Sequence, residues 1–286
     1  MNAITIDPRQ LRRQLHGQWA AVAPAWGEHA DFIDARGAGV TGRLLELAAP
    51  SPGERVLELA CGAGGLGLAA AGLVAPTGEA VLSDVAPEML AEADARIAAR
   101  GIANATTLRL DLEQIDQPDA AYDVVVSREG LMFALDPAAA VAEIARVLRP
   151  GGRVAVAVWG PREQNPWLGI VLDAVSTQTG APVPPPGIPG PFALSDSERL
   201  AGLFTAAGLD AVAVEQLAVP LRTPSFDDWW ARTTALAGPL SQRLAKLPAE
   251  AQAALRALAE QSSARYRDGE ALVFPGSTLI AAAHRR

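Results

Sequence analysis

One stretch indicates the fold class most clearly, because in it a mostly apolar run passes through glycines into a helical pattern: Val56-Leu57-Glu58-Leu59-Ala60-Cys61-Gly62-Ala63-Gly64-Gly65-Leu66-Gly67. Residues 56–59 are typical of a buried strand. Glycines directly after a strand permit a tight turn, and they let the backbone approach a ligand without a Cβ in the way. This order predicts the first strand–turn–helix unit of an α/β sheet.

Outward from this unit, short β-branched runs alternate with helical ones from about residue 53 to residue 159, as in a parallel sheet covered by helices. Right-handed crossovers between such strands give a doubly wound sheet. We expect strands at 55–59, 80–83, 106–109, 122–127, 152–159, 211–219 and 277–283, and helices near 65–75, 86–100 and 137–148.

The second half of the chain departs from this alternation. Residues 181–191 hold six prolines and two glycines, which is typical of a stiff surface loop. Ser195 and Glu198 have capping-box spacing, so a helix is expected to begin there and to be closed by Gly208. The stretch 226–266 predicts two or three helices. Because it separates two expected strands, we interpret it as a cap inserted in the sheet.

Charge and cysteine content exclude several classes of protein. With 24 basic and 32 acidic residues the net charge is −8, and the sequence has no long basic cluster for nucleic acid or an anionic membrane. The single cysteine, Cys61, can form neither an internal disulfide nor a zinc site. The first residues lack the pattern of a signal peptide, and the Ala-rich run 68–75 is too short to span a bilayer. We therefore expect a cytoplasmic protein.

Three interpretations of the glycine-rich turn are open. It can be a tight turn with no ligand, or, because Gly62, Gly64 and Gly67 have the G-x-G-x-x-G spacing, a site for NAD. Asp84, at the end of the second strand, suits ribose hydroxyls in either ligand-binding case. Glu58 distinguishes between possible ligands. Its carboxylate repels the pyrophosphate of NAD but attracts a ligand with an ammonium and a sulfonium group. S-adenosylmethionine is such a ligand.

Four motifs in order carry a resemblance to a known family: Glu58-Leu-Ala-Cys-Gly62-Ala-Gly64, Ser83-Asp84-Val85-Ala86-Pro87-Glu88-Met89-Leu90, Asp111-Leu112-Glu113 and Arg146-Val147-Leu148-Arg149-Pro150-Gly151-Gly152. Over roughly residues 50–160 the chain resembles the class I S-adenosylmethionine-dependent methyltransferases, and among them the ubiquinone/menaquinone-biosynthesis type and its natural-product relatives. The resemblance implies a Rossmann-like sheet of seven strands whose last strand is antiparallel, with N-terminal helices and the inserted helical cap.

The resemblance also implies that S-adenosylmethionine is held at the ends of the first four strands. Its amino-acid end would meet Glu58, its ribose Asp84, and its adenine Met89 and Asp111. The other expected contacts are Gly62, Gly64, Val85, Leu112 and Ser127. Simpler roles are open for three residues: Asp84 as a helix N-cap, Asp111 as a turn cap and Met89 as core packing. Ala60 departs from the family, which usually has a glycine there.

The sequence indicates the cofactor more clearly than it indicates the catalytic residues. A sulfonium methyl is already activated, so its transfer requires an aligned acceptor and no metal. A general base is needed only for a hydroxyl or a protonated amine. His29 is the candidate base, with a surface histidine as its alternative. The aromatic side chains of the N-terminal segment and the cap predict a pocket for a flat, apolar molecule. The expected pocket residues are Trp19, Trp26, Arg128, Trp229 and Trp230.

We therefore predict an enzyme that transfers a methyl group from S-adenosylmethionine to O, N or C of a secondary metabolite or a quinone-like ring. The alternatives are the same fold with non-methylating catalysis, such as a cyclase, then an NAD-dependent oxidoreductase, and a binding module. The partner is a small-molecule acceptor, without nucleic acid or membrane, and a homodimer is left open. The expected segments are an N-terminal helical lid (1–48), a cofactor-binding core with the loop 181–191 (49–222), the cap (223–272) and the final strand (273–286).

Overall fold

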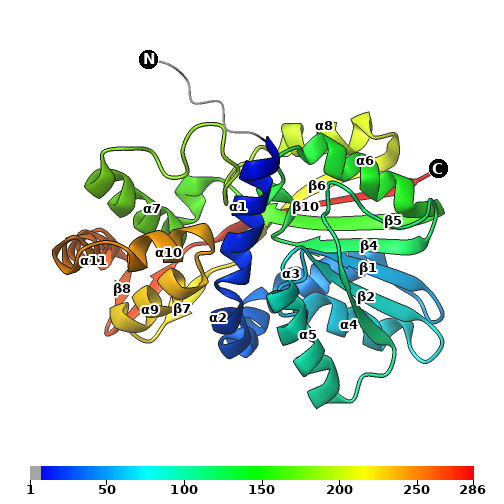
Figure 1. The fold of residues 1–286 in the computed structure, drawn as a ribbon, viewed down its shortest axis with the longest axis horizontal. Coiled ribbons are helices and arrows are strands. Elements are labelled where there is room, and N and C mark those ends of the chain that lie inside the picture. The colour runs from blue at the N-terminus through cyan, green and yellow to red at the C-terminus, as the bar shows by residue number, and fades with distance from the viewer. Residues whose placement is uncertain (1–7) are drawn as a thin grey trace.

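The structure, a computed structural model, describes residues 8–286 and is built around a seven-stranded sheet in the order β3-β2-β1-β4-β5-β10-β6 (Figure 1). Neighbouring strands from β3 to β5 are parallel, whereas β10 is antiparallel to both β5 and β6. The predicted doubly wound α/β class with an antiparallel last strand is confirmed. The strands are β1 (Arg55–Leu59), β2 (Glu79–Asp84), β3 (Ala105–Arg109), β4 (Tyr122–Arg128), β5 (Leu148–Trp159), β6 (Leu209–Ala218) and β10 (Ser277–Arg285).

The order of the strands reverses between β1 and β4. The chain runs from β1 outward to β2 and β3, and then returns to the other side of β1 to form β4 and β5. The loops that follow β1 and β4 therefore lead in opposite directions and leave a crevice at the carboxyl ends of these strands. In open α/β sheets this is where ligands bind.

Helices cover both faces of the sheet, because successive strand residues point to opposite sides and both sides are apolar. Val56 and Val124 face α3 and α4, and Leu57 and Val125 belong to the cluster that α6 and α8 cover; all four are fully buried. The helix α5 packs beside α4 along β2 and β3. The bounds are α3 (Ala30–Ala48), α4 (Gly65–Val74), α5 (Pro87–Arg100), α6 (Pro137–Val147) and α8 (Ser197–Ala206).

Between β6 and β10 the chain forms the inserted block, which we define as residues 221–274. It contains three α-helices, where two or three were predicted, and a three-stranded sheet β7-β9-β8 that was not predicted. The expected boundary between residues 222 and 223 falls within β7. The elements are β7 (Leu221–Thr223), α9 (Phe226–Leu236), α10 (Pro239–Ala245), α11 (Ala249–Ser263), β8 (Arg267–Asp268) and β9 (Ala271–Phe274).

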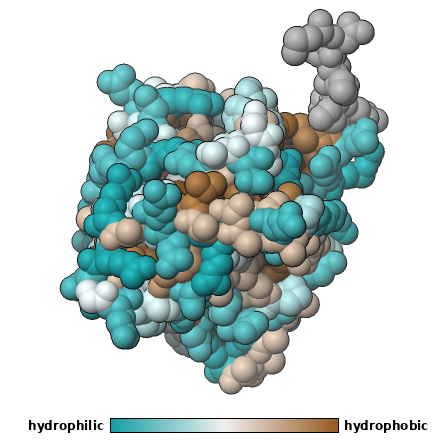
Figure 2. Space-filling view, turned by 90° about the vertical axis from the view of Figure 1, so that its left-hand side faces the viewer, coloured by the Kyte–Doolittle hydropathy of each residue, from teal (hydrophilic) through white to brown (hydrophobic). Residues whose placement is uncertain are grey.

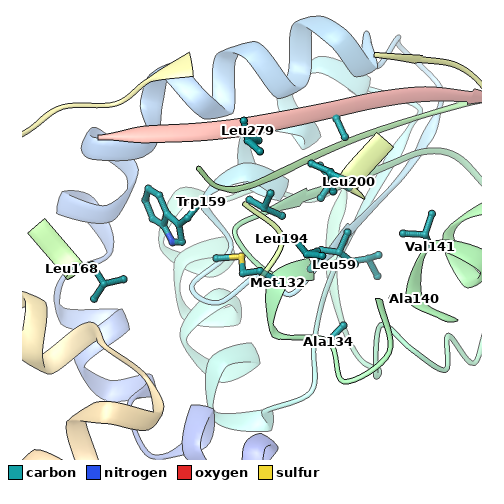
Figure 3. Packing of buried hydrophobic residues seen from close by; sticks show 14 of the residues in the cluster. Leu59, Met132, Ala134, Ala140, Val141, Trp159, Leu168, Leu194, Leu200 and Leu279 are labelled. Atoms are coloured by element: carbon teal, nitrogen blue, oxygen red, sulfur yellow. The ribbon is translucent and has the colours of Figure 1, made fainter. Parts of the chain in front are cut away.

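One further helix, α7 (Pro166–Thr179), was not predicted. Nine of its fourteen residues are buried, so it lacks the polar face that gives a helix its periodic sequence pattern. It packs against α11 of the inserted block, and it extends the main hydrophobic cluster from the sheet into that block. Figure 3 shows Leu168 of α7, Trp159 at the end of β5 and Met132 among the residues of this cluster.

The predicted capping box before α8 is wrong in its first residue. The N-cap is Asp196, whose Oδ1 accepts a hydrogen bond of 2.8 Å from the backbone N of Arg199. Ser195 lies one position too early to cap the helix. Aspartate and serine are comparable N-cap residues, so residue type alone does not distinguish Asp196 from Ser195. The side chain nearest the first helical turn accepts the capping hydrogen bond.

The N-terminal helices α1 (Pro8–Ala20) and α2 (Ala23–Glu28) join the two halves of the molecule. α1 crosses the junction between the sheet and the inserted block (Figure 1) and contacts α5 on one side and α10 on the other. Seen from the side on which α7 and α11 lie, a mostly hydrophilic surface carries a band of apolar side chains across its middle (Figure 2). None of the described helices has the length and hydropathy to cross a membrane. Residues 1–7 of the expected lid lie outside the described part.

Candidate functional site

Two adjoining cavities lie at the carboxyl edge of the parallel strands, the smaller at the ends of β1 to β4 and the larger at the ends of β4 and β5. The smaller cavity is bounded by the glycine-rich turn after β1 and by the loops after β2, β3 and β4. It brings together most of the residues that were predicted to hold a cofactor, although they come from the ends of three separate strands, β1, β2 and β3. Its lining includes Glu58, Gly62, Asp84, Val85, Met89, Asp111 and Leu112.

The turn after β1 is held in left-handed backbone conformations. The φ angles of Ala60, Gly62 and Gly64 are 52°, 53° and 82°, and such angles cost a non-glycine residue about 1–2 kcal/mol. A Cβ at Gly62 would lie 3.0 Å from the ring of Trp26, which covers the turn. Glycine is therefore required at 62 both for its conformation and for the close approach of Trp26.

Ala60 is the residue that departs from the family pattern, and its methyl group has a structural consequence. A Cβ on Gly130 would overlap the Cβ of Ala60, so Gly130 leaves the room that Ala60 occupies. Gly130 has a φ of −108°, which any residue adopts. Glycine is therefore needed at position 130 because a larger residue would collide with Ala60, and not because of its backbone conformation.

The contact between Ala60 and position 130 predicts a non-additive pair of substitutions. Gly130→Ala should lower the free energy of unfolding by about 1–3 kcal/mol through overpacking. Ala60→Gly alone should be nearly neutral, because relief of the strained φ offsets the entropy that glycine adds to the unfolded chain. The double variant should recover most of the loss. Chemical denaturation of the four proteins measures this coupling, and strictly additive effects would contradict the contact.

Glu58 is a buried acid whose second oxygen has no basic partner among the residues that the structure describes. It is 3% exposed, and its Oε2 accepts a hydrogen bond of 2.8 Å from the backbone N of Gly67 at the start of α4. Burial raises the pKa of Glu58 to about 8, against the opposing effect of Arg128. A ligand that brings a positive charge to this point would stabilise the carboxylate form.

Asp84 links the glycine-rich turn to the end of β2. Its Oδ2 accepts from the backbone N of Gly62, and its Oδ1 accepts from the backbone N of Ala86, both at 3.0 Å. Burial raises the pKa of the Asp84 carboxyl. The helix α5 has Ala86 as its N-cap residue, so Asp84 is not the helix cap that was the alternative. Each of its oxygens can accept one more hydrogen bond, from a hydroxyl in the cavity.

Asp111 is joined to α1 by an ion pair. Nη1 of Arg12 lies 2.8 Å from Asp111 Oδ2, and Nη2 of the same guanidinium lies 2.7 Å from Glu113 Oε2. The Oδ1 atom of Asp111 also accepts from the backbone N of Glu113 at 2.9 Å. These ion pairs hold α1 over the smaller cavity. The Asp111 carboxylate that would accept from an adenine amino group is therefore already paired with Arg12.

Three residues predicted to hold the cofactor or to act in catalysis line neither cavity. Gly64 is the N-cap of α4, where its missing Cβ makes room for Leu82. Ser127 donates a hydrogen bond of 2.9 Å from Oγ to the backbone O of Leu59, and so fixes β4 against β1. His29 lies between α2 and α3 and lines neither cavity. The structure does not place it where a base would act on an acceptor.

The larger cavity has a volume of about 410 Å³ and lies between the sheet, α1, α3, α7 and the inserted block. Its walls are mainly apolar and aromatic, with Trp19, Trp26, Phe32 and Trp229 among them. Trp230, which was also predicted to line the pocket, stacks on Phe226 instead. The proline-rich loop 181–191, predicted as a surface loop, supplies one wall, from Val183 to Pro191.

A shared wall separates the two cavities. Six residues line both of them: Leu15, Trp19, Trp26, Ile33, Glu129 and Phe133. Trp19 makes edge-to-face contacts with Phe133 (4.8 Å between centroids) and with Trp26 (6.2 Å). Glu129 is the charged member, held at a φ of 63°, and burial raises the pKa of its carboxyl. Arg128, predicted for the substrate pocket, lines only the smaller cavity.

Arg36 was missed by the sequence analysis. It lines the larger cavity from α3, and its guanidinium carbon lies 4.0 Å from the ring centroid of Trp167 and 4.6 Å from that of Trp159. The local sequence Asp34-Ala35-Arg36 resembles that of any exposed helix, so no signal near Arg36 indicates this position. Only the fold brings the two tryptophans of β5 and α7 to it.

A methyltransferase domain model matches residues 56–152. Among curated proteins, the ubiquinone/menaquinone biosynthesis C-methyltransferase UbiE of Ralstonia nicotianae is 32% identical over 227 residues, which cover 72% of this chain and 88% of that enzyme. Several UbiE proteins of other bacteria are 37–38% identical over shorter stretches, and the chain spans about half the length of those relatives.

Two solved structures share the fold. The YcgJ protein of Bacillus subtilis has a TM-score of 0.60 and 20% identity, with 86% of this chain and 97% of that chain covered. The cyclase SpnF has a TM-score of 0.53 and 19% identity, with 86% of this chain and 79% of that chain covered. At these identities the likeness is one of fold alone.

Proposed function

The chain belongs to the class I S-adenosylmethionine-dependent methyltransferases of the ubiquinone/menaquinone-biosynthesis type, and we propose that it methylates O, N or C of a small, flat and apolar acceptor. The smaller cavity would hold the cofactor and the larger cavity the acceptor. The observation that carries this proposal is the wall of six residues that the two cavities share, because it brings a donor and an acceptor within reach of each other.

The residues of the smaller cavity fit the cofactor. Glu58 is a buried acid without a basic partner within residues 8–286, and it suits the ammonium group of the amino-acid end. Asp84 has acceptor capacity left for the ribose hydroxyls. When bound, S-adenosylmethionine supplies a methyl group on a positively charged sulfur, which an acceptor takes by direct displacement while the bonding electrons return to sulfur.

The residues of the larger cavity would position the acceptor and keep water out. Its aromatic walls favour a flat ring system, such as a secondary metabolite or a quinone-like ring. Trp229 is fully buried in this wall and donates a hydrogen bond of 3.1 Å from Nε1 to the backbone O of Trp167, so the wall is fixed before any acceptor enters. A dry, rigid pocket favours a displacement in which charge disperses.

Calorimetric titration tests the cofactor. We expect S-adenosylmethionine to bind with one site per chain and NADH to give no heat of binding. Tight binding of NADH without binding of S-adenosylmethionine would overturn the proposal. Turnover with methyl-labelled cofactor and a panel of quinols, phenols and aromatic amines then tests the reaction, with label in the product and release of S-adenosylhomocysteine as the expected result.

The non-methylating alternative makes a different prediction in the same assay. A protein that uses the cofactor only as a structural element, as a cyclase of this fold would, binds S-adenosylmethionine but releases no S-adenosylhomocysteine during turnover of its true substrate. A binding module predicts that no substitution at Asp84 alters any activity.

A further inference from the structure

Arg36 is half-buried and places a positive charge on the wall of the larger cavity. Its Nε and Nη2 atoms are buried and have no hydrogen-bond partner within the described chain. These two nitrogens form the edge of a guanidinium group that binds a carboxylate through two parallel hydrogen bonds. Removing a cation from water costs several kcal/mol, and the attraction of Glu129 opposes the effect of burial without a direct hydrogen bond to these two nitrogens.

Two tryptophans hold the guanidinium in place without neutralising it. Trp167 and Trp159 lie 4.0 and 4.6 Å from it and are themselves in edge-to-face contact, with centroids 5.2 Å apart. Cation–π contacts contribute about 0.5–2 kcal/mol each, which offsets only part of the desolvation cost. Burial lowers the pKa of Arg36 to about 10, so the group is charged at neutral pH. It is a positioned cation on a rigid aromatic platform.

Two less exposed arginines of the cavity walls, Arg128 and Arg232, have partners, and Arg243 is exposed to solvent, which sets Arg36 apart. Arg128 donates a hydrogen bond of 2.7 Å to Thr41 Oγ1 and lies 3.4 Å from Asp34 Oδ1. Arg232 lies 2.6 Å from Asp228 Oδ1. Glu129 attracts Arg36 electrostatically, but within residues 8–286 no carboxylate lies at ion-pair distance from Arg36.

The larger cavity as a whole has the opposite charge balance to the chain. The net charge of the chain is −8. The charged residues that line the cavity are three arginines and one glutamate: Arg36, Arg232, Arg243 and Glu129. The indole Nε1 of Trp26, on the shared wall, is a further buried donor without a partner. The buried polar atoms of this lining that lack a partner among the described residues are thus three donor nitrogens, on Arg36 and Trp26, and one acceptor, Oε1 of Gln18.

We propose that the acceptor molecule carries a carboxylate on a flat apolar ring system, and that Arg36 binds this carboxylate from its tryptophan platform. The inference rests on the proposed function, since it names the substrate class of the same site. The carboxylate would fix the far end of the molecule, and the ring would extend along the aromatic wall toward the shared wall. Arg36 is then a binding and orienting residue.

Binding of simple probes tests the proposal without turnover. The protein is first saturated with S-adenosylhomocysteine, and calorimetry is then used to titrate biphenyl-4-carboxylate, biphenyl-4-carboxamide and biphenyl-4-methylammonium. We expect the carboxylate to bind about 10–100-fold more tightly than the amide, as a buried charge-assisted pair does. Arg36→Met should bring the ratio near one and change the affinity for the amide less than about threefold. Arg36→Lys should retain part of the preference.

Arg243→Met is the matched control, because Arg243 lines the same cavity but is exposed. It should leave the preference for the carboxylate intact. Equal binding of carboxylate and amide by the wild type, tightest binding of the ammonium probe, or an unchanged preference in Arg36→Met would each overturn the proposal. A protein that fails to bind S-adenosylhomocysteine would contradict the proposed function at the first step, before any probe is added.

Discussion

Replacing Asp84 by alanine is expected to weaken the binding of S-adenosylmethionine about 100-fold. Each ribose hydroxyl that donates to a buried carboxylate is worth about 1.5 kcal/mol or more, and the loss of two such bonds amounts to about 3 kcal/mol. The substitution also removes the acceptors of the Gly62 and Ala86 backbone N–H groups, so the turn loosens. Calorimetry at a temperature well below the melting transition measures the loss.

A control separates this loss of binding from a loss of stability. Asp196→Ala removes the N-cap of α8, which lines neither cavity, and should lower the free energy of unfolding by about 1 kcal/mol while cofactor affinity stays unchanged. Asp84→Asn keeps one acceptor oxygen and should fall between the wild type and Asp84→Ala. Affinity in Asp84→Ala within about threefold of wild type would show that Asp84 serves the turn alone.

The second large effect is the release of a proton from Glu58 when the cofactor binds. The pKa of Glu58 is about 8 in the ligand-free protein, so near pH 6.5 this carboxyl holds a proton. An ammonium group bound beside it favours the carboxylate, and binding of S-adenosylmethionine should therefore release close to one proton. The affinity should rise between about pH 6 and 7.5, below the range in which an α-amino group itself loses its proton. Calorimetry in buffers of different ionisation enthalpy counts the released protons.

Glu58→Gln is the test of this assignment, because the amide oxygen can still accept from the backbone N of Gly67. The variant should bind the cofactor about tenfold or more weakly and release no proton. Proton release that is the same in both proteins would assign the effect to another group.

The same carboxyl gives the ligand-free protein a pH-dependent stability. The pKa of Glu58 rises from 4.5 to about 8 on folding, so between these values the folded protein holds a proton that the unfolded chain has lost. Its contribution to the free energy of unfolding therefore falls as the pH rises through this window. Denaturant midpoints measured from pH 5 to 8 should show this decline in the wild type and a flatter profile in Glu58→Gln.

The cofactor half of the site could be predicted from the sequence because its residues occupy short, ordered motifs at strand ends. Glu58 and Asp84 each follow an apolar run directly, and parallel strands bring their carboxyl ends to one edge. The strand order then placed both in one cavity. Local pattern and topology together were sufficient for this part.

The substrate half could not be predicted in the same way. Arg36 is far in the chain from Trp159 and Trp167, and their meeting depends on how α3 and α7 pack at the end of β5. α7 itself has no periodic pattern, because most of it is buried. His29 attracted attention as a histidine between aromatic residues, but the packing of α2 and α3 directs it away from both cavities.

A crystal structure with S-adenosylhomocysteine would show directly whether the smaller cavity holds the cofactor. We predict that the amino-acid end of the ligand lies beside Glu58 and its ribose hydroxyls on Asp84. Its sulfur should face the larger cavity across the shared wall of Trp19, Trp26, Glu129 and Phe133. Density for the ligand inside the larger cavity, or a sulfur atom that faces away from the shared wall, would contradict this prediction.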